Sequence, residues 1–235
     1  IYPSNPLYNS KEIPIMSMDH FCLKAGKIGN FFIRFYAKSL LDKRIKLNLK
    51  PLLYPHMALL SLRNLSFPHK VDFHDDYIDL IREKHLELFS NYDLIGINVL
   101  TQSAKRAYQL YDFLKPLNIP IALGGPHISA VAEEAKSHCD ILCIGPAETY
   151  WSELIKDVER KQYKKIYHSN YNDTLIHKFR YYSSGYEEFD SFGYLPVTIP
   201  VYSRGCNNFC SFCFISNFIS TWHSRNMDEV VEDII

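Results

Sequence analysis

The chain is short of glycine, of net charge and of long apolar runs. Only nine of its 235 residues are glycine, so each glycine position carries information about a turn or a close backbone contact. The 26 basic and 26 acidic side chains give no net charge. The chain therefore lacks the excess of basic residues that is typical of a dedicated nucleic-acid-binding protein. No run reaches the roughly 18 apolar residues that span a bilayer, and no secretory signal pattern opens the chain. We therefore expect a cytoplasmic protein with no transmembrane segment and no nucleic-acid partner.

What is present is an ordinary globular composition, with 47% hydrophobic and 22% charged residues. From about residue 46, short apolar runs alternate with segments of helical period, which is typical of βαβ units. The clearest strands are expected at 93–99, 119–123 and 141–144, with helices at 103–114, 130–137 and 151–160. Weaker signals predict strands at 45–49 and 71–74 and helices at 56–65 and 79–89. The fold class is therefore α/β, with a Rossmann-like (flavodoxin-like) parallel sheet.

Glycine follows two of the predicted strands directly. Gly124-Gly125-Pro126-His127 comes after one, and the loop from Gly145 to Glu148 comes after the next. Doubly wound sheets place their ligands at the carboxyl ends of the strands, where glycine lets the backbone approach a bound group closely. These two loops predict a ligand crevice at that edge of the sheet.

The sequence divides into four parts. Residues 1–45 carry no assigned function, and residues 46–165 form the predicted sheet domain. Residues 166–195 hold six tyrosines and little periodicity, as a connector would. Residues 196–235 contain a predicted strand at 197–202, a cysteine loop and a predicted helix from 227. The chain begins with Ile1 and has no helix-stop signal at its end, so we expect it to be truncated within this last part.

Three of the six cysteines lie within eight residues, Cys206, Cys210 and Cys213. A C-x3-C-x2-C array lets one loop place three thiolates around a compact iron–sulfur cluster. Structural zinc and electron-transfer clusters take four ligands, so a set of three leaves one metal position open for chemistry. The alternative is a zinc site completed by a further residue, for which the candidates are His223, Cys22, Cys139 and Cys143.

This loop resembles the cluster-binding signature of the radical SAM superfamily, C-x3-C-x-aromatic-C, with Phe212 as the aromatic residue. The Ser-Arg-Gly lead-in at 203–205 and the Trp-His-Ser-Arg segment at 222–225 resemble the same superfamily. The resemblance implies that the last part of the chain, 196–235, is the first βα unit of a radical SAM partial TIM barrel. The resemblance implies a [4Fe–4S] cluster on Cys206, Cys210 and Cys213 whose open iron binds S-adenosylmethionine. It also implies reductive cleavage of that molecule to methionine and a 5′-deoxyadenosyl radical, which abstracts hydrogen from a substrate. No catalytic residue beyond the cluster ligands is assignable.

The sheet domain resembles that of the cobalamin (B12)-binding-domain radical SAM proteins over roughly residues 50–235. The similarity rests on residues 93–96, 124–129, 133–135, 140, 145–148 and 204–206. It implies cobalamin at the sheet edge, and the residues it places there are Thr101, Gly124, Gly125, Pro126, His127, Gly145 and Glu148.

Two departures stand beside this resemblance. The family's Gly-Glu-x-Glu loop reads Gly-Pro-Ala-Glu at 145–148 in this chain. Pro146 therefore replaces a carboxylate, which weakens the case for corrin contact at this loop. The D-x-H-x-x-G motif is absent, because Tyr77 replaces the glycine that would follow Asp72 and His74. We therefore expect no histidine of this domain to ligate cobalt.

The resemblance implies a radical SAM enzyme, with C-methylation among its reactions. It implies a small-molecule or lipid-like substrate and an electron donor such as flavodoxin or ferredoxin. Two alternatives stay open at this point: a non-catalytic remnant that binds an iron–sulfur cluster or cobalamin, and a zinc-stabilised α/β protein.

Overall fold

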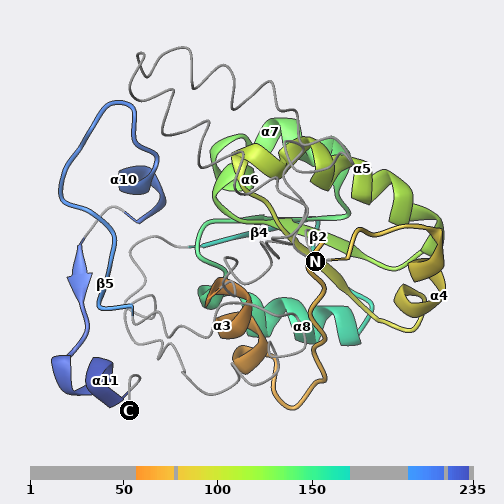
Figure 1. Cartoon of the computed structure of the whole chain (residues 1–235), viewed down its shortest axis with the longest axis horizontal. Coiled ribbons are helices and arrows are strands. Elements are labelled where there is room, and N and C mark those ends of the chain that lie inside the picture. Colours follow the sequence, from red (N-terminus) through yellow and green to blue (C-terminus); the bar gives the residue numbers. More distant parts are fainter. Residues whose placement is uncertain (1–56, 77–78, 170–200, 220–221, 233–235) are drawn as a thin grey trace, which may run out of the picture.

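A computed structural model describes residues 57–76, 79–169, 201–219 and 222–232. At its centre is a sheet of four parallel strands in the order β1-β2-β3-β4 (Figure 1). Their bounds are Ile95–Asn98, Ile121–Gly124, Ile141–Ile144 and Ile166–His168. The α/β class with a Rossmann-like parallel sheet is thereby confirmed.

Helices cover both faces of this sheet (Figure 1). On one face lie α5, α6 and α7, which span Ala104–Leu114, Pro126–Ala130 and Ala132–Ala135. On the other lie α3, Met57–Leu65, and α8, Trp151–Glu159. The remaining elements of the domain are α4, Leu86–Phe89, and the 3-10 turns η3 to η7 at Glu83–His85, Thr101–Ser103, Lys115–Leu117, Lys136–His138 and Ala147–Thr149.

Strands β2 and β3 are apolar on both sides because each side meets a layer of helices. Ile121 and Leu123 of β2 enter the core beneath α5 and α6, while Ala122 between them enters the core on the α8 side. Alternate strand residues point to opposite faces, and a strand covered on both faces reads as a continuous apolar run. This is why the runs at 119–123 and 141–144 predict their strands well.

An ion pair inside the domain fastens α5 to the segment before α4. Arg106 donates from Nε and Nη2 to Asp76 Oδ2 and Oδ1 at 2.8 and 2.9 Å, and its Nη2 also donates to the Ile81 carbonyl at 3.2 Å. The Ile81 N–H donates to the same carboxylate at 2.7 Å. The Asp76 side chain is wholly buried, so this carboxylate depends on these donors in place of water.

Several predicted elements differ from the observed ones. The predicted strand at 71–74 is wrong, because this segment has no strand and its Asp72 and His74 are hydrogen-bonded to Tyr92 and to the Asp79 carbonyl. The helix predicted at 79–89 begins later, as η3 and α4. The single helix predicted at 130–137 is observed as α7 and η6, and a separate helix, α6, precedes it from Pro126, whose fixed φ suits the first helical turn. The strand expected at 45–49 lies outside the described residues.

Strand β4 falls at the start of the range interpreted as a connector. It pairs with β3 through Leu142 and Ile166, Cys143 and Tyr167, and Ile144 and His168. The rest of that range, from 170 on, lies outside the described residues. The described sheet therefore extends to His168.

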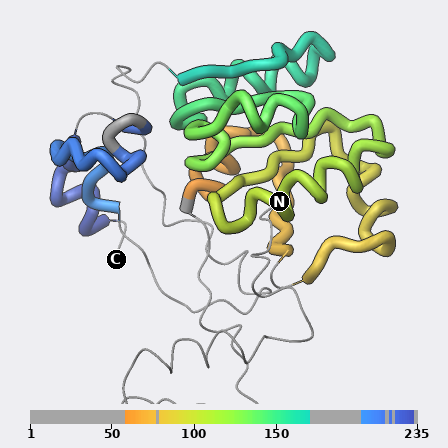
Figure 2. Tube along the Cα trace, turned by 90° about the horizontal axis from the view of Figure 1, so that it is seen from above, coloured from red at the N-terminus to blue at the C-terminus, as the bar shows by residue number. Residues whose placement is uncertain are grey.

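The cysteine segment, residues 201–232, lies beside the sheet domain (Figure 2). It contains β5, Ser203–Arg204, α10, Ile215–Phe218, β6, His223–Ser224, and α11, Met227–Glu232. The two strands pair antiparallel, and Arg225 ties the base of the loop by donating to the Val201 carbonyl at 3.2 Å. The helix predicted from 227 is confirmed over 227–232. Of the strand predicted at 197–202, the two described residues, Val201 and Tyr202, are not in a strand.

Across the ranges described by the structure, no helix has the length and apolar character needed to cross a membrane.

Candidate cofactor site

Gly125 occupies a position that requires glycine. Its φ is +107°, and a Cβ added there would lie 2.5 Å from Asn98 Oδ1 and 2.8 Å from the Val99 carbonyl oxygen. The turn is held by backbone hydrogen bonds, because Val99 N–H donates to the Gly124 carbonyl and His127 N–H donates to the Val99 carbonyl. The end of β1 and the start of α6 are therefore in direct backbone contact, as expected for a glycine loop at a sheet edge.

We expect Gly125→Ala to destabilise the fold by more than the roughly 1–3 kcal/mol of such a backbone conformation alone, because the new methyl group also meets Asn98. Thermal and urea unfolding measure the loss. Gly96→Ala is the matched control, since a Cβ there would meet only Trp151 at an ordinary 3.9 Å. Equal stability of the two variants would show that the strain at Gly125 is absent in solution.

Ser129 of α6 connects the two glycine loops. Its hydroxyl donates to the Gly125 carbonyl at 3.0 Å and accepts from the Gly145 N–H at 2.9 Å. The loops after β2 and β3 are therefore joined by one side chain, and the sheet edge is built as a unit.

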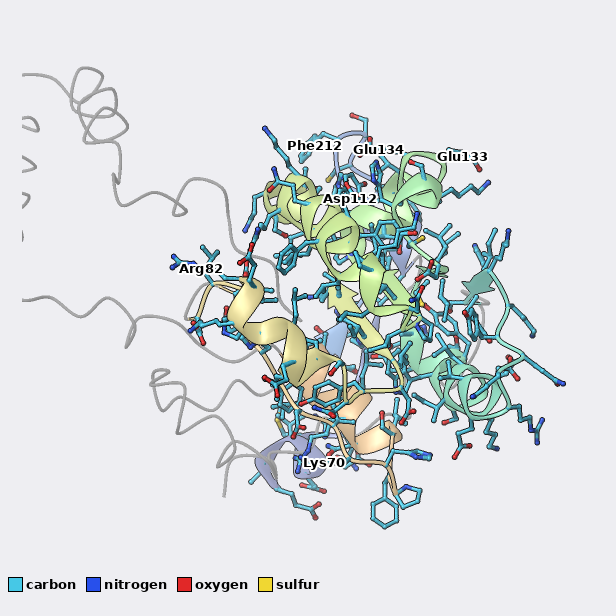
Figure 3. All side chains as sticks on the ribbon, turned by 90° about the vertical axis from the view of Figure 1, so that its right-hand side faces the viewer. Lys70, Arg82, Asp112, Glu133, Glu134 and Phe212 are labelled. Carbon is cyan, nitrogen blue, oxygen red and sulfur yellow. The ribbon has the colours of Figure 1, made fainter. Side chains whose placement is uncertain are left out.

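His127 and Thr101 meet at the same edge. The His127 Nδ1 lies 3.3 Å from the Thr101 hydroxyl, and its Nε2 lies 3.4 Å from the Tyr108 hydroxyl and 3.8 Å from Glu134 Oε1. Tyr108 donates to Glu134 at 2.9 Å, and burial raises the pKa of Tyr108, which keeps its hydroxyl protonated as a donor. In Figure 3, Glu134 on α7 lies beside α5, the helix that carries Asp112. The predicted pair of Thr101 and His127 is therefore in contact within one polar network.

Glu148 reaches out of the sheet domain to the cysteine segment. Its Oε1 lies 2.7 Å from Arg204 Nη2, and the two side chains are 7% and 20% exposed. Arg204 is in β5, two residues before Cys206. The two regions predicted separately from the sequence, the second glycine loop and the cysteine loop, are thus joined by a largely buried ion pair.

None of the three loop cysteines is joined in a disulfide, and each has access to solvent. Cys210 is exposed, and Cys206 and Cys213 are partly exposed. The Cys213 N–H donates to the Cys210 carbonyl at 3.0 Å, and the Asn208 N–H points at Cys206 Sγ at 3.4 Å. Phe212 is 90% exposed. In the part of the chain that the structure describes, no three His, Cys, Asp or Glu side chains lie close enough together to hold a metal ion.

The donor set nevertheless fits an iron–sulfur cluster. Such clusters are held by cysteine thiolates, and this loop offers three reduced thiols that are neither buried nor joined in a disulfide. The other described cysteines are different in kind, because Cys143 lies buried in β3 and Cys139 donates to the Ala135 carbonyl at 3.4 Å. Cys22 lies outside the described residues.

We expect alkylation at pH 8 to separate these two kinds of thiol. Burial raises the pKa of Cys143 to about 12 and that of Cys139 to about 11, so both stay protonated, and only the thiolate reacts quickly. Iodoacetamide should label the loop peptide first and Cys143 last, as followed by peptide mass spectrometry. Labelling of Cys143 at the rate of Cys210 would contradict the described burial of β3.

Comparison with known proteins gives the chain methyltransferase relatives. It is 32% identical over 182 residues, 73% of its length, to bacteriochlorophyllide d C-8(2)-methyltransferase of Chlorobaculum tepidum. It is 28% identical over 148 residues to bacteriochlorophyllide d C-12(1)-methyltransferase of the same organism, and 25% identical over 93 residues to a tRNA-2-methylthio-N(6)-dimethylallyladenosine synthase of Treponema pallidum. The chain spans 38%, 32% and 19% of the length of these relatives. No family model matches it.

Sequence reasoning missed the partners of the candidate residues more than the residues themselves. Arg204 belongs to the lead-in of the cysteine loop, but its sequence position predicts no role for it, and no sequence signal marks Tyr108. Ser129 lies within the 124–129 segment that carries the family resemblance, but the sequence predicts no contact for its side chain. The one available signal was the position of Arg204, a charged residue immediately before Gly205 and the first cysteine.

Proposed function

We propose that the protein is a radical SAM enzyme, of the branch with a cobalamin-binding domain, that methylates carbon. The observation that carries this is a loop of three solvent-accessible cysteines outside any disulfide, Cys206, Cys210 and Cys213, in a chain 32% identical over 182 residues to a methyltransferase. The division into a sheet domain, a connector and a cluster-binding part, 196–235, belongs to this proposal, with the sheet domain extended from 46–165 to His168 so that it includes β4. The β5, cysteine loop and α11 order supports it.

In this proposal, Cys206, Cys210 and Cys213 hold three irons of a [4Fe–4S] cluster. When bound, the cluster supplies an open iron for S-adenosylmethionine and the electron that cleaves its sulfonium. The protein's own part is to position the three cysteine ligands and to keep the loop anchored at its base. Arg225 supports this last role through its bond to the Val201 carbonyl.

We propose the carboxyl edge of the sheet as the cobalamin site. In this proposal the partly exposed Gly124 and Gly125 and the exposed Pro126 form its surface, and Thr101 and His127 lie there in mutual contact. Gly145 is buried, so it supports this edge from beneath. Both ring nitrogens of His127 already have side-chain neighbours. His74 is hydrogen-bonded to the Asp79 carbonyl at 2.7 Å. Neither histidine is proposed as a cobalt ligand.

The experiment is anaerobic reconstitution of the purified protein with iron and sulfide, followed by S-adenosylmethionine and dithionite. The expected result is about four irons per chain, since a cubane of that size is proposed, absorbance in the iron–sulfur region and formation of 5′-deoxyadenosine. Cluster without 5′-deoxyadenosine would favour the non-catalytic remnant. One tightly bound zinc without iron–sulfur absorbance would favour the zinc-stabilised protein.

The substrate is proposed as a small molecule or lipid-like molecule, with electrons supplied by a flavodoxin or ferredoxin in the cytoplasm. Two relatives are named for methyl transfer to bacteriochlorophyllide d, which supports a small-molecule acceptor. Methyl-labelled S-adenosylmethionine and a panel that includes this acceptor test the class. Label in tRNA and in no small molecule would contradict it.

A further inference from the structure

We propose that Glu148 is a positioning residue of the cysteine loop, acting through Arg204, and that it makes no contact with a ligand at the sheet edge. This rests on the proposed function, because it assigns Glu148 to the cluster side of the site. The family resemblance places this residue at the cobalamin edge, so the geometry changes its role.

The first step is the environment of the Glu148 carboxylate. Its side chain is 7% exposed, and Oε1 is 2.7 Å from Arg204 Nη2. A buried carboxylate that lost its cation would be left without solvation, which is strongly unfavourable. Separating the two charges of this pair is therefore costly, whereas an exposed ion pair can separate at little cost.

The second step is the rigidity of the element that carries Glu148. Turn η7 follows Pro146, and the Thr149 hydroxyl donates to the Pro146 carbonyl at 3.1 Å. The Tyr150 N–H donates to the Ala147 carbonyl, and the Tyr150 side chain is buried in the α8-side core. Glu148 thus lies on a turn that is held by hydrogen bonds and by the buried Tyr150 ring. A rigid turn of this kind suits a residue that fixes the position of Arg204.

The third step is the place of Arg204 in the cysteine segment. Arg204 is the last residue of β5 and pairs with His223 of β6. Gly205 follows with a φ of +77°, and Cys206 comes next. The chain turns into the cysteine loop directly after the residue that Glu148 holds. Fixing Arg204 therefore fixes the point from which the first thiol leaves the strand.

The test is amide hydrogen exchange on the purified apo protein, comparing wild type with Glu148→Gln, Arg204→Gln and the double variant. We expect each single variant to raise exchange in 201–213 about tenfold, a local opening that leaves β1 to β3 protected. The double variant should exchange less than the two single effects combined, because it leaves no unpaired charge. Glu153→Gln is the matched control: Glu153 pairs with Lys164 and both side chains are more than half exposed.

Unchanged exchange of 201–213 in both single variants would overturn the proposal. So would an increase spread evenly over β1 to β3, since Glu148 would then stabilise the sheet domain without positioning the loop. Iron content after reconstitution is the second readout, expected to fall in Glu148→Gln and to stay at the wild-type value in Glu153→Gln. A wild-type protein that takes up no iron refutes the proposed function, while the exchange data still decide the role of Glu148.

Discussion

Cys210→Ser protein should form no 5′-deoxyadenosine from S-adenosylmethionine and dithionite. Serine keeps the size of the side chain but replaces the thiolate, and cubane clusters are held by cysteine thiolates. Because the loop offers three thiols, the loss of one leaves two, too few for a cluster with a single open iron. Cys210 is exposed, so the substitution removes no core packing. Chromatography of the nucleoside product, together with iron content, measures the effect.

Cys139→Ser is the control for this experiment. Cys139 is a free thiol of the sheet domain, outside the loop, and its serine variant should keep both cluster and product. Full 5′-deoxyadenosine formation by the Cys210 variant would remove the three-cysteine site from the mechanism. Loss of product in both variants would mean that the ligands had been assigned to the wrong cysteines.

The largest expected effect on stability comes from Arg106→Met. Methionine fills much of the space of the arginine stem but leaves the wholly buried Asp76 carboxylate without its bidentate partner. Breaking a buried pair by removing one member costs about 3–5 kcal/mol. Urea unfolding should show this loss as a lower midpoint at an unchanged slope.

Lys105→Met is the matched control, because Lys105 is exposed on the same helix, and it should be near neutral. Combining Arg106→Met with Asp76→Asn should recover part of the loss, since the double variant has no unpaired buried charge. A single variant Arg106→Met as stable as the wild type would show that water reaches Asp76.

The sheet and its glycine loops could be predicted because their signals are local. The runs at 119–123 and 141–144 are apolar throughout, since helices cover both sides of β2 and β3. Glycine after each run marks the end of the strand without any knowledge of its neighbours. The same reasoning predicts Gly125 for the candidate crevice, and the structure shows a backbone position there that requires glycine.

The rest depended on contacts between distant parts of the chain. Strand β4 has no apolar run, because Ile166 and His168 are exposed and only Tyr167 is buried. It can be recognised as a strand only from its pairing with β3 in the folded protein. The ion pair of Glu148 with Arg204 joins residues on either side of the range read as a connector. Hydrophobic periodicity in the sequence cannot predict an ion pair between residues so far apart, because the two side chains meet only in the folded protein.

The hydroxyl of Ser129 carries one proton, and that proton is committed to the Gly125 carbonyl. Its lone pairs therefore face the Gly145 N–H, which is already bonded to them. Gly145 thus has no amide hydrogen to offer an incoming phosphate or amide group. At the proposed cobalamin site, hydrogen-bond donors for a ligand must therefore come from residues other than Gly145, which is itself buried.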